Sequence, residues 1–177
     1  GAIAAVGLAG LDADGFAAAL ASFPGMRRRL ELRGRVNGAE VYDDYAHHPT
    51  EVEAAIAALR ERDPRRLIAV FQPHLYSRTK ALADRFGAAL ATADEVGVLD
   101  VYAAREEPVG ELEGVSGLLV AEAAADRAGG RPVWWLREPE QALAAIAPRL
   151  ADGDVVVALG AGDVGDRFAG PLVGEGS

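Results

Sequence analysis

Leu67-Ile68-Ala69-Val70-Phe71 is the stretch of sequence that decides the fold, because five consecutive apolar residues fit a strand that is buried on both faces. A second run of this kind, Val155-Val156-Val157-Ala158-Leu159, stands near the end of the chain. Strands buried on both faces are typical of parallel sheets, whereas half-exposed antiparallel strands alternate polar and apolar residues. The two runs therefore predict an α/β fold.

Helical and strand patterns alternate along the chain around these two runs. Pro49 suits the first position of a helix. The apolar residues that share one face of this helix are Val52, Ala55, Ile56 and Leu59. Similar patterns predict helices at 77–91, 116–128 and 138–150, strands at 95–101 and 132–136, and a short final helix. This order implies a mostly parallel sheet with right-handed crossovers and helices on both faces.

An antiparallel hairpin is expected to open the sheet. Residues 29–33 alternate polar and apolar side chains, and residues 40–45 supply a return strand. Asn37-Gly38 lies between them, and this pair favours a tight hairpin turn. The hairpin would therefore add an antiparallel strand at one end of an otherwise parallel sheet.

The beginning of the chain carries a different pattern. Residues 1–23 predict two short helical pieces, of which the first has no polar face. Such a helix packs either on a neighbouring domain or on the core of this one, and the sequence leaves both interpretations open. We place the boundary so that 1–24 are a trailing fragment of a preceding domain and 25–177 form the domain itself.

Composition excludes several classes of protein. The net charge of −9 disfavours binding to nucleic acid or to an anionic membrane. The absence of cysteine excludes disulfides, thiolate metal sites and cysteine nucleophiles. No apolar run approaches the ~18 residues that would span a bilayer, and no basic stretch precedes the first apolar segment as in a signal peptide. The expected location is therefore the cytoplasm.

Lys80 is the single lysine among 18 basic residues. A Walker A loop needs a lysine directly after its glycines, because this side chain reaches the nucleotide phosphates. Lys80 follows Arg78-Thr79 with no glycine-rich loop before it. The chain by itself is therefore expected to carry no Walker A site.

Polar and glycine-rich segments follow three of the predicted strands. They comprise residues 43–51, 72–79 and 160–163, and the first two contain all three histidines of the chain. Ligands of open α/β sheets bind outside the carboxyl ends of the strands. We therefore expect the three segments to meet along one edge of the sheet.

The histidines favour a substrate-binding cluster over a metal site. Adjacent side chains such as His47 and His48 diverge, and a catalytic zinc needs three correctly placed ligands. A metal site built from these residues, His74, Asp43 and Asp44 is the weaker hypothesis. In the remaining interpretation, His48 caps the following helix and the others are packing residues.

Gly160, Gly162 and Gly165 match a G-x-G-x-x-G pattern directly after a strand. A dinucleotide site also needs an acidic residue about 20 positions later, and only twelve residues follow Gly165. This excludes an NAD site, although the loop can still present backbone N–H groups to an anion. Asp163 either faces such a ligand or caps the final helix.

Together the three segments resemble the Mur ligase family of peptidoglycan synthesis. Asp43-Asp44-Tyr45-Ala46-His47-His48-Pro49-Thr50-Glu51, Gln72-Pro73-His74-Leu75-Tyr76-Ser77-Arg78-Thr79 and Gly160-Ala161-Gly162-Asp163 are its motifs. Their form is most similar to the member that attaches L-alanine to UDP-N-acetylmuramate. The resemblance spans nearly the whole chain. It implies the C-terminal, Rossmann-like domain of a three-domain ligase, preceded by the end of the central ATPase domain.

The resemblance implies a role for individual residues. Residues of the nucleotide side are Arg29 near the ATP phosphates, Asp44 at the ribose, and Tyr45. Residues of the amino-acid side are His47, His74, Ser77 and Arg78, and the possible anion loop contains Gly160, Gly162 and Asp163. Arg28 and Arg29 stand at the family's paired arginines. Leu75 replaces an arginine of some members, so any role of that arginine does not transfer.

The resemblance also implies cofactors and substrates. The complete enzyme would use ATP and Mg²⁺ to join L-alanine to UDP-N-acetylmuramate, and the chain alone would be inactive because the P-loop domain is absent from it. One alternative is a recycling ligase that attaches a tripeptide to the same sugar, but the Gln-Pro-His-x-x-Ser-Arg-Thr form favours the alanine enzyme. A second alternative is a non-enzymatic nucleotide- or anion-binding module.

Overall fold

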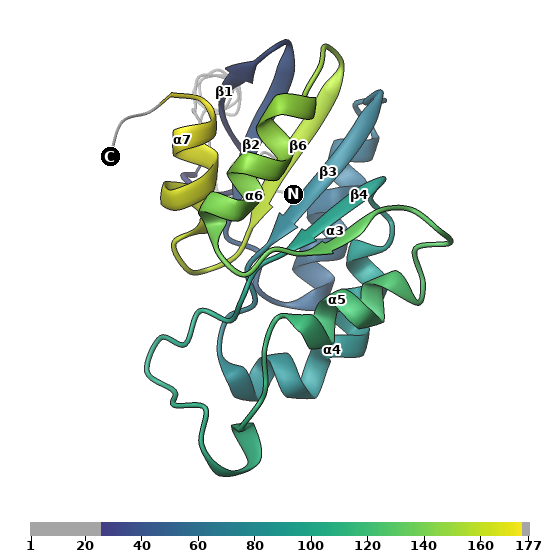
Figure 1. The fold of residues 1–177 in the computed structure, drawn as a ribbon. Coiled ribbons are helices and arrows are strands. Elements are labelled where there is room, and N and C mark those ends of the chain that lie inside the picture. Colours follow the sequence, from purple (N-terminus) through teal and green to yellow (C-terminus); the bar gives the residue numbers. More distant parts are fainter. Residues whose placement is uncertain (1–25, 175–177) are drawn as a thin grey trace, which may run out of the picture.

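The computed structural model describes residues 26–174, so the helical pieces predicted within 1–23 lie outside the described residues. A six-stranded sheet forms its centre, with the strand order β1-β2-β6-β3-β4-β5 (Figure 1). The strands are β1 (Glu31–Val36), β2 (Ala39–Asp44), β3 (Arg66–Phe71), β4 (Glu95–Val98), β5 (Val133–Trp135) and β6 (Asp154–Leu159). The β1–β2 hairpin is antiparallel and all other pairings are parallel. The predicted fold class is confirmed.

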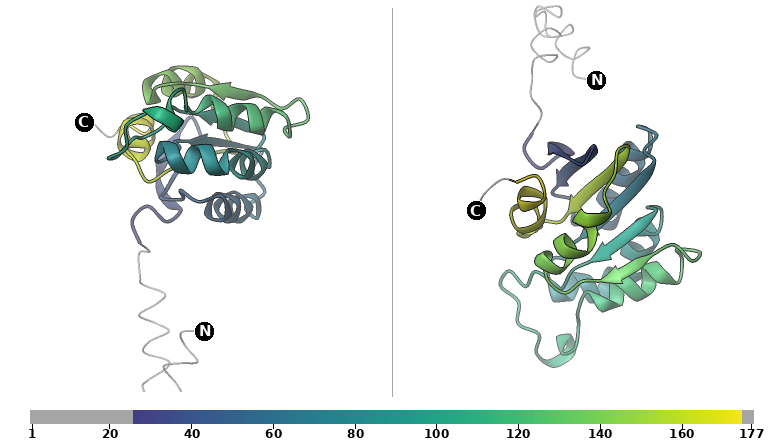
Figure 2. Two further views of the ribbon diagram at one scale, coloured as in Figure 1. Left: turned by 90° about the horizontal axis from the view of Figure 1, so that it is seen from below. Right: turned by 45° about the horizontal axis from the view of Figure 1, so that its top comes forward.

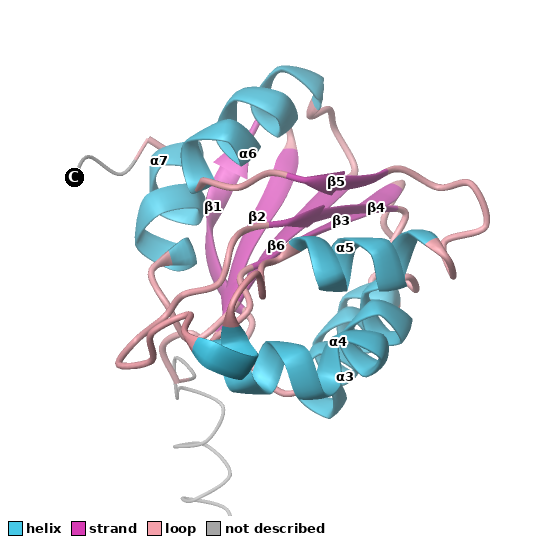
Figure 3. Cartoon of the chain, turned by 60° about the horizontal axis from the view of Figure 1, so that its bottom comes forward, coloured by secondary structure: helices cyan, strands magenta, loops and turns pink. Residues whose placement is uncertain are grey.

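Helices cover both faces of the sheet (Figures 2 and 3). One face carries α3 (Pro49–Arg60), α4 (Tyr76–Leu90) and α5 (Leu118–Ala125), and the other carries α6 (Pro139–Ile146) and α7 (Gly170–Leu172). No helix within residues 26–174 is long and apolar enough to cross a membrane.

Several elements are shorter than their sequence patterns predict. The strand expected at 95–101 ends at Val98, and the helix expected at 116–128 is α5. The helix expected at 138–150 ends at Ile146 and continues as a 3₁₀ turn that contains Pro148, because proline cannot donate the next helical hydrogen bond. The final helix is a π-helical turn at Gly165–Ala169 followed by α7.

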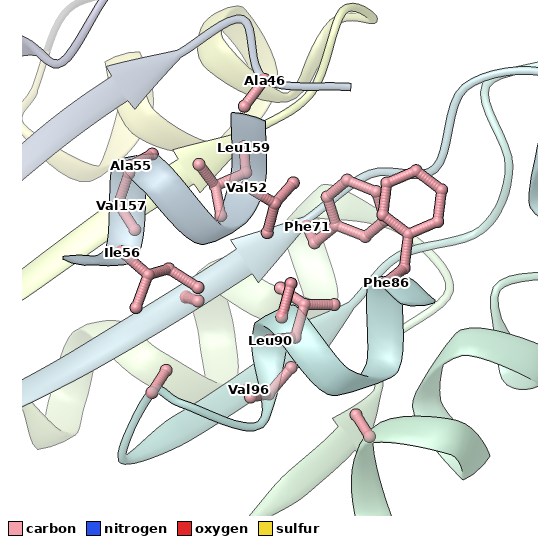
Figure 4. Packing of buried hydrophobic residues seen from close by; sticks show 14 of the residues in the cluster. Ala46, Val52, Ala55, Ile56, Phe71, Phe86, Leu90, Val96, Val157 and Leu159 are labelled. Carbon is pink, nitrogen blue, oxygen red and sulfur yellow. The ribbon is translucent and has the colours of Figure 1, made fainter. Parts of the chain in front are cut away.

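Two apolar clusters pack against the two faces of the sheet. Phe71 and Phe86, whose ring centres lie 4.8 Å apart, belong to the cluster beneath α3, α4 and α5 (Figure 4). Ile68 and Val70 of the same strand belong to the cluster beneath α6 and α7. Successive side chains of a strand point to opposite faces, so a strand between two helical layers must be apolar at every position. This explains the two runs that predicted the fold.

The register of the central strands brings their carboxyl ends to one level. Asp44 of β2 lies beside Leu159 of β6, and Leu159 lies beside Phe71 of β3. Backbone hydrogen bonds extend this alignment past the strands, from Gly160 N–H to Asp44 O and from Gln72 N–H to Leu159 O. The segments that follow β2, β3 and β6 therefore leave the sheet side by side.

Candidate functional site

The three predicted segments meet at the carboxyl edge of the sheet, as expected. The His47 ring centre lies 6.3 Å from that of His74 and 5.4 Å from that of Tyr45. His74 in turn stacks on Tyr102, from the loop after β4, with ring centres 5.7 Å apart. The edge therefore carries a row of rings contributed by three different strand ends.

His48 does not join this row. It is the N-cap of α3, where its Nδ1 accepts a 3.4 Å hydrogen bond from Thr50 N–H, and Glu51 completes the capping box. The interpretation that His48 caps the helix is confirmed. Within residues 26–174, no group of three or more histidine or acidic side chains is arranged to hold a metal ion.

The surroundings of His74 favour the neutral form of its ring. Burial is the main cause that lowers its pKa, and the positive charge of Arg78 lowers it further. Its buried Nδ1 has no hydrogen-bond partner among residues 26–174. A neutral imidazole with a free ring nitrogen offers a donor or an acceptor to a ligand, depending on the tautomer.

Arg78 is the third residue of α4, which begins at the edge of the site. Its Nη1 approaches His47 O at 3.5 Å. A cation near a helix N-terminus opposes the helix dipole. A surface ion pair with Glu106 or Glu107 is an alternative explanation for this arginine, but within the described residues Arg78 forms no such pair at 4.0 Å or less. An arginine in this place suits an anionic ligand.

Glu106 instead binds the first turn of α4. Its carboxylate accepts hydrogen bonds from Ser77 N–H at 2.9 Å and from Ser77 Oγ at 2.5 Å. The bond from the Ser77 hydroxyl is the main cause that lowers the pKa of Glu106. Leu75, the N-cap residue, has no side-chain cap of its own and a φ of 71°. The loop after β4 thus supplies the missing cap.

The glycine loop after β6 is tied to the segment after β3. Gln72 Nε2 donates to Asp163 Oδ1 at 2.7 Å, and Gln72 Oε1 accepts from Val164 N–H at 3.2 Å. The Asp163 carboxylate therefore binds Gln72 and does not cap the final helix, contrary to one of its two predicted roles. A Cβ at Gly162 would overlap Gln72 and Tyr102, and one at Gly160 would lie 2.9 Å from Gln72 O. This close approach requires both glycines, and the loop's role in anion binding stays a prediction.

Asp44 lines a separate pocket. The pocket has a volume of about 330 Å³, and its lining residues are Arg29, Leu30, Asp44, Glu51, Ala54 and Ala55. The buried Asp44 carboxylate accepts hydrogen bonds from Leu30 N–H at 2.7 Å and from Ala46 N–H at 2.8 Å. The structure thus brings the predicted residues Arg29 and Asp44 together. Tyr45 is exposed outside this pocket, with the Arg28 guanidinium 4.9 Å from its ring centre.

Sequence reasoning missed several residues of this edge. They are Gln72, Tyr102 and Glu106. Gln72 stands inside a quoted motif, so its place directly after a buried strand was a usable signal. Tyr102 and Glu106 belong to a loop that sequence patterns describe only as polar.

Comparisons with known proteins identify the family of the chain. A family model described as Mur ligase, glutamate ligase domain, matches residues 28–162. A UDP-N-acetylmuramate–L-alanine ligase of Mycolicibacterium vanbaalenii is 53% identical over 168 residues, which cover 93% of this chain and 34% of that protein. The chain therefore spans about a third of the length of such relatives.

Solved structures share the fold. A UDP-N-acetylmuramate-alanine ligase from Thermotoga maritima superposes with a TM-score of 0.74 at 24% identity, over 93% of this chain and 34% of that one. A murein peptide ligase from Psychrobacter arcticus superposes with a TM-score of 0.65 at 25% identity, over 99% of this chain and 36% of that one.

Proposed function

The chain belongs to the Mur ligase family, and on this premise we propose that it is the C-terminal part of an ATP-dependent ligase that joins L-alanine to UDP-N-acetylmuramate. The observation that supports the proposal most directly is the gathering of His47, His74 and Arg78 at one strand edge beside the Asp44 pocket. A protein 53% identical to this chain is an L-alanine ligase. An amino-acid side and a nucleotide side would then be neighbours.

The nucleotide side is assigned to the pocket of Arg29 and Asp44. A buried carboxylate accepts hydrogen bonds from ribose hydroxyls, and each Asp44 oxygen keeps a lone pair beyond its backbone partner. Arg29 lines the same pocket and offers a cation for phosphate oxygens. Tyr45 is also assigned to the nucleotide side, because its exposed ring directly follows β2, the strand that carries Asp44.

The amino-acid side is assigned to Arg78, His74, His47 and Ser77. Arginine matches a carboxylate with two parallel hydrogen bonds, and Arg78 stands at the start of α4 with no acidic partner within 4.0 Å among the described residues. The neutral His74 ring beside it can accept a hydrogen bond from the amine of L-alanine. Gly160, Gly162 and Asp163 form the proposed anion loop, which lies against Tyr102.

ATP and Mg²⁺ are the proposed cofactors of the complete enzyme, in which Mg²⁺ would neutralise phosphate charge. The described residues hold no cluster of carboxylates that fits this ion, and we assign it no step on this chain. Phosphoryl transfer depends on positioning several groups in one closed site. The proposed location is the cytoplasm, where UDP-sugar substrates and ATP would meet the enzyme.

The test measures ADP release by the complete ligase and by the 177-residue chain. The complete enzyme is expected to release ADP only with UDP-N-acetylmuramate and L-alanine together, and the chain alone to release none. Release with a tripeptide and not with L-alanine would favour the recycling ligase, whose fold is represented by the murein peptide ligase. Nucleotide binding with no turnover of either substrate would favour a non-enzymatic module.

A further inference from the structure

Asp43 is a buried carboxylate to which the roles above assign no function. Its side chain is 1% exposed, and it points to the face opposite that of Asp44, because successive side chains of a strand alternate. Gly165 lies so close that a Cβ at that position would overlap the Asp43 carboxylate. A buried charge is costly unless its partners offset the desolvation, so those partners indicate what the burial serves.

Two arginines supply positive charge to Asp43. Arg33 Nη1 lies 3.3 Å from Asp43 Oδ2, and Arg28 Nε lies 3.4 Å from the same oxygen. Arg33 belongs to the neighbouring strand β1, so this contact stays within the sheet. Arg28 precedes the sheet, in the segment through which the chain enters the domain. Asp43 therefore connects the entering segment to the interior.

Arg28 is held at several further points. Its Nη2 donates to Gly160 O at 2.6 Å, and its guanidinium lies 4.9 Å from the ring centre of Tyr45. Its backbone N–H donates to Glu31 Oε2 at 2.7 Å, and its carbonyl accepts from Tyr45 N–H at 2.9 Å. Its φ of 54° is uncommon for a residue other than glycine. Such a conformation persists where the surrounding contacts over-determine it.

The entering segment is also held from the other face of the sheet. Leu30, with a φ of 44°, donates its N–H to Asp44 Oδ2 at 2.7 Å. Asp43 and Asp44 thus hold residues 28 and 30 from opposite faces. Arg29 lies between these two anchored residues and lines the pocket that contains Asp44. The direction of the Arg29 side chain therefore depends on the contacts that hold Arg28 and Leu30.

We propose that Asp43 is a positioning residue for nucleotide binding. It holds Arg28, and through Arg28 it holds the entering segment, so that Arg29 stays at the pocket beside Asp44. The proposal rests on the ATP-dependent function proposed above. Asp43 acts here through other residues and contacts no nucleotide itself.

The first experiment measures amide hydrogen exchange in the 177-residue chain. Asp43→Asn preserves the shape of the side chain and removes its charge. The N–H of Leu30 binds the Asp44 carboxylate, and the N–H of Tyr45 binds the Arg28 carbonyl. Both N–H groups should exchange about 10-fold faster in this variant, as expected for local opening of one segment. Arg33→Ala is the matched control, because it removes the other cation from the same carboxylate. Unchanged exchange in Asp43→Asn, or equal acceleration in Arg33→Ala, would overturn the proposal.

The second experiment measures kinetics in the complete ligase. Asp43→Asn should raise the KM for ATP about 10- to 100-fold, the scale of a small misplacement in a site, and leave the KM for L-alanine unchanged. Arg28→Ala should likewise raise the KM for ATP and leave the KM for L-alanine unchanged. The double variant should be no more impaired than the more impaired of the two single variants, because both substitutions act through one contact. Equal increases in both KM values, or additive effects, would contradict the assigned role.

Arg28→Ala also keeps the test decisive if Asp43→Asn fails to fold. Arg28 is 28% exposed, and its removal leaves Arg33 to neutralise Asp43. An unsubstituted complete enzyme without ligase activity would refute the proposed function. The amide-exchange experiment would then still decide whether Asp43 holds the segment, so the two failures are distinguishable.

Discussion

Two doublets at the carboxyl edge, Asp43-Asp44 and His47-His48, divide their side chains between different neighbours. The aspartates belong to β2 and point to opposite faces of the sheet. His47 lies in the row of rings, whereas His48 caps α3. Adjacent identical residues therefore have separate roles, and a sequence motif that contains a doublet does not define one site.

Arg78→Ala is expected to impair the use of L-alanine by the complete ligase. Removal of one member of a desolvated charge pair costs about 2–5 kcal/mol, so kcat/KM for L-alanine should fall accordingly while the KM for ATP changes little. Arg78→Lys should recover part of the loss, because lysine lacks the bidentate geometry. Arg85→Ala, on the exposed side of the same helix, is the control. Unchanged L-alanine kinetics would show that Arg78 is a surface residue that does not bind L-alanine.

His74→Gln is expected to flatten the pH dependence of stability. Burial lowers the pKa of His74 in the folded chain, whereas the unfolded chain binds the proton with the ordinary pKa of about 6.5. As the pH falls through this value, the unfolded state gains a proton that the folded state lacks, so the free energy of unfolding decreases. Urea unfolding of both forms between about pH 7.5 and 5.5 measures the difference. Parallel curves for the two forms would contradict it.

Asp44 binds a different kind of partner from the buried carboxylates at the amino edge of the sheet. At the amino edge, Glu95 and Asp154 are buried and paired with arginines, including Arg66, which contacts both. At the carboxyl edge, Asp44 accepts backbone N–H groups and still lines a pocket. The arginine-paired carboxylates Glu95 and Asp154 serve the packing of strand ends. Carboxylates held by backbone groups remain available to a ligand.

Gly87→Ala is expected to destabilise the contact between α4 and α5. A Cβ at position 87 would lie 2.5 Å from the carbonyl carbon of Ala123 and 2.7 Å from Ala124 N, so backbone atoms must move. Overpacking of this kind costs about 1–3 kcal/mol, which exceeds the gain of about 0.5–1 kcal/mol from replacing a helical glycine.

Chemical unfolding of the 177-residue chain measures this balance. Ala88→Ser on the exposed side of α4 is the matched control, and it should change the free energy of unfolding by only about 0.5 kcal/mol. A Gly87→Ala variant at least as stable as the unsubstituted chain would show that the two helices separate without cost.

The whole molecule is organised by its two apolar clusters, one on each face of the sheet. Both clusters contain residues from distant parts of the chain, and within the described part of the chain they extend from Leu30 to Val173. Helices from the same range cover both faces. A core of this kind closes around the sheet without a further layer.

Deletion of residues 1–23 is therefore expected to preserve cooperative folding. The shortened chain should show one thermal transition whose calorimetric and van't Hoff enthalpies agree, as for a two-state domain. Its melting temperature should stay close to that of the 177-residue chain. Loss of the cooperative transition would show that the deleted residues are part of the core of this domain. The same result would contradict the predicted boundary at residue 24.

The sequence by itself determined the fold class, the hairpin, and the segments that carry the site. Runs such as residues 67–71 and 155–159 are apolar at every position because helices cover both faces, and that pattern is local in the chain. The motifs around Asp44, His74 and Gly160 follow strands directly, so their meeting at one edge could be predicted. Element ends were less predictable, since β4 ends at Val98 and α6 at Ile146, before the apolar patterns end.

Only the tertiary structure decided which side chains meet across these segments. Gln72 binds Asp163, 91 residues away, and Arg28 binds Gly160, 132 residues away. These contacts exist because β6 inserts between β2 and β3 in the sheet, and local sequence patterns do not encode strand order. The stacking of Tyr102 on His74 has the same origin, since the loop after β4 reaches the carboxyl edge where the segment after β3 also lies.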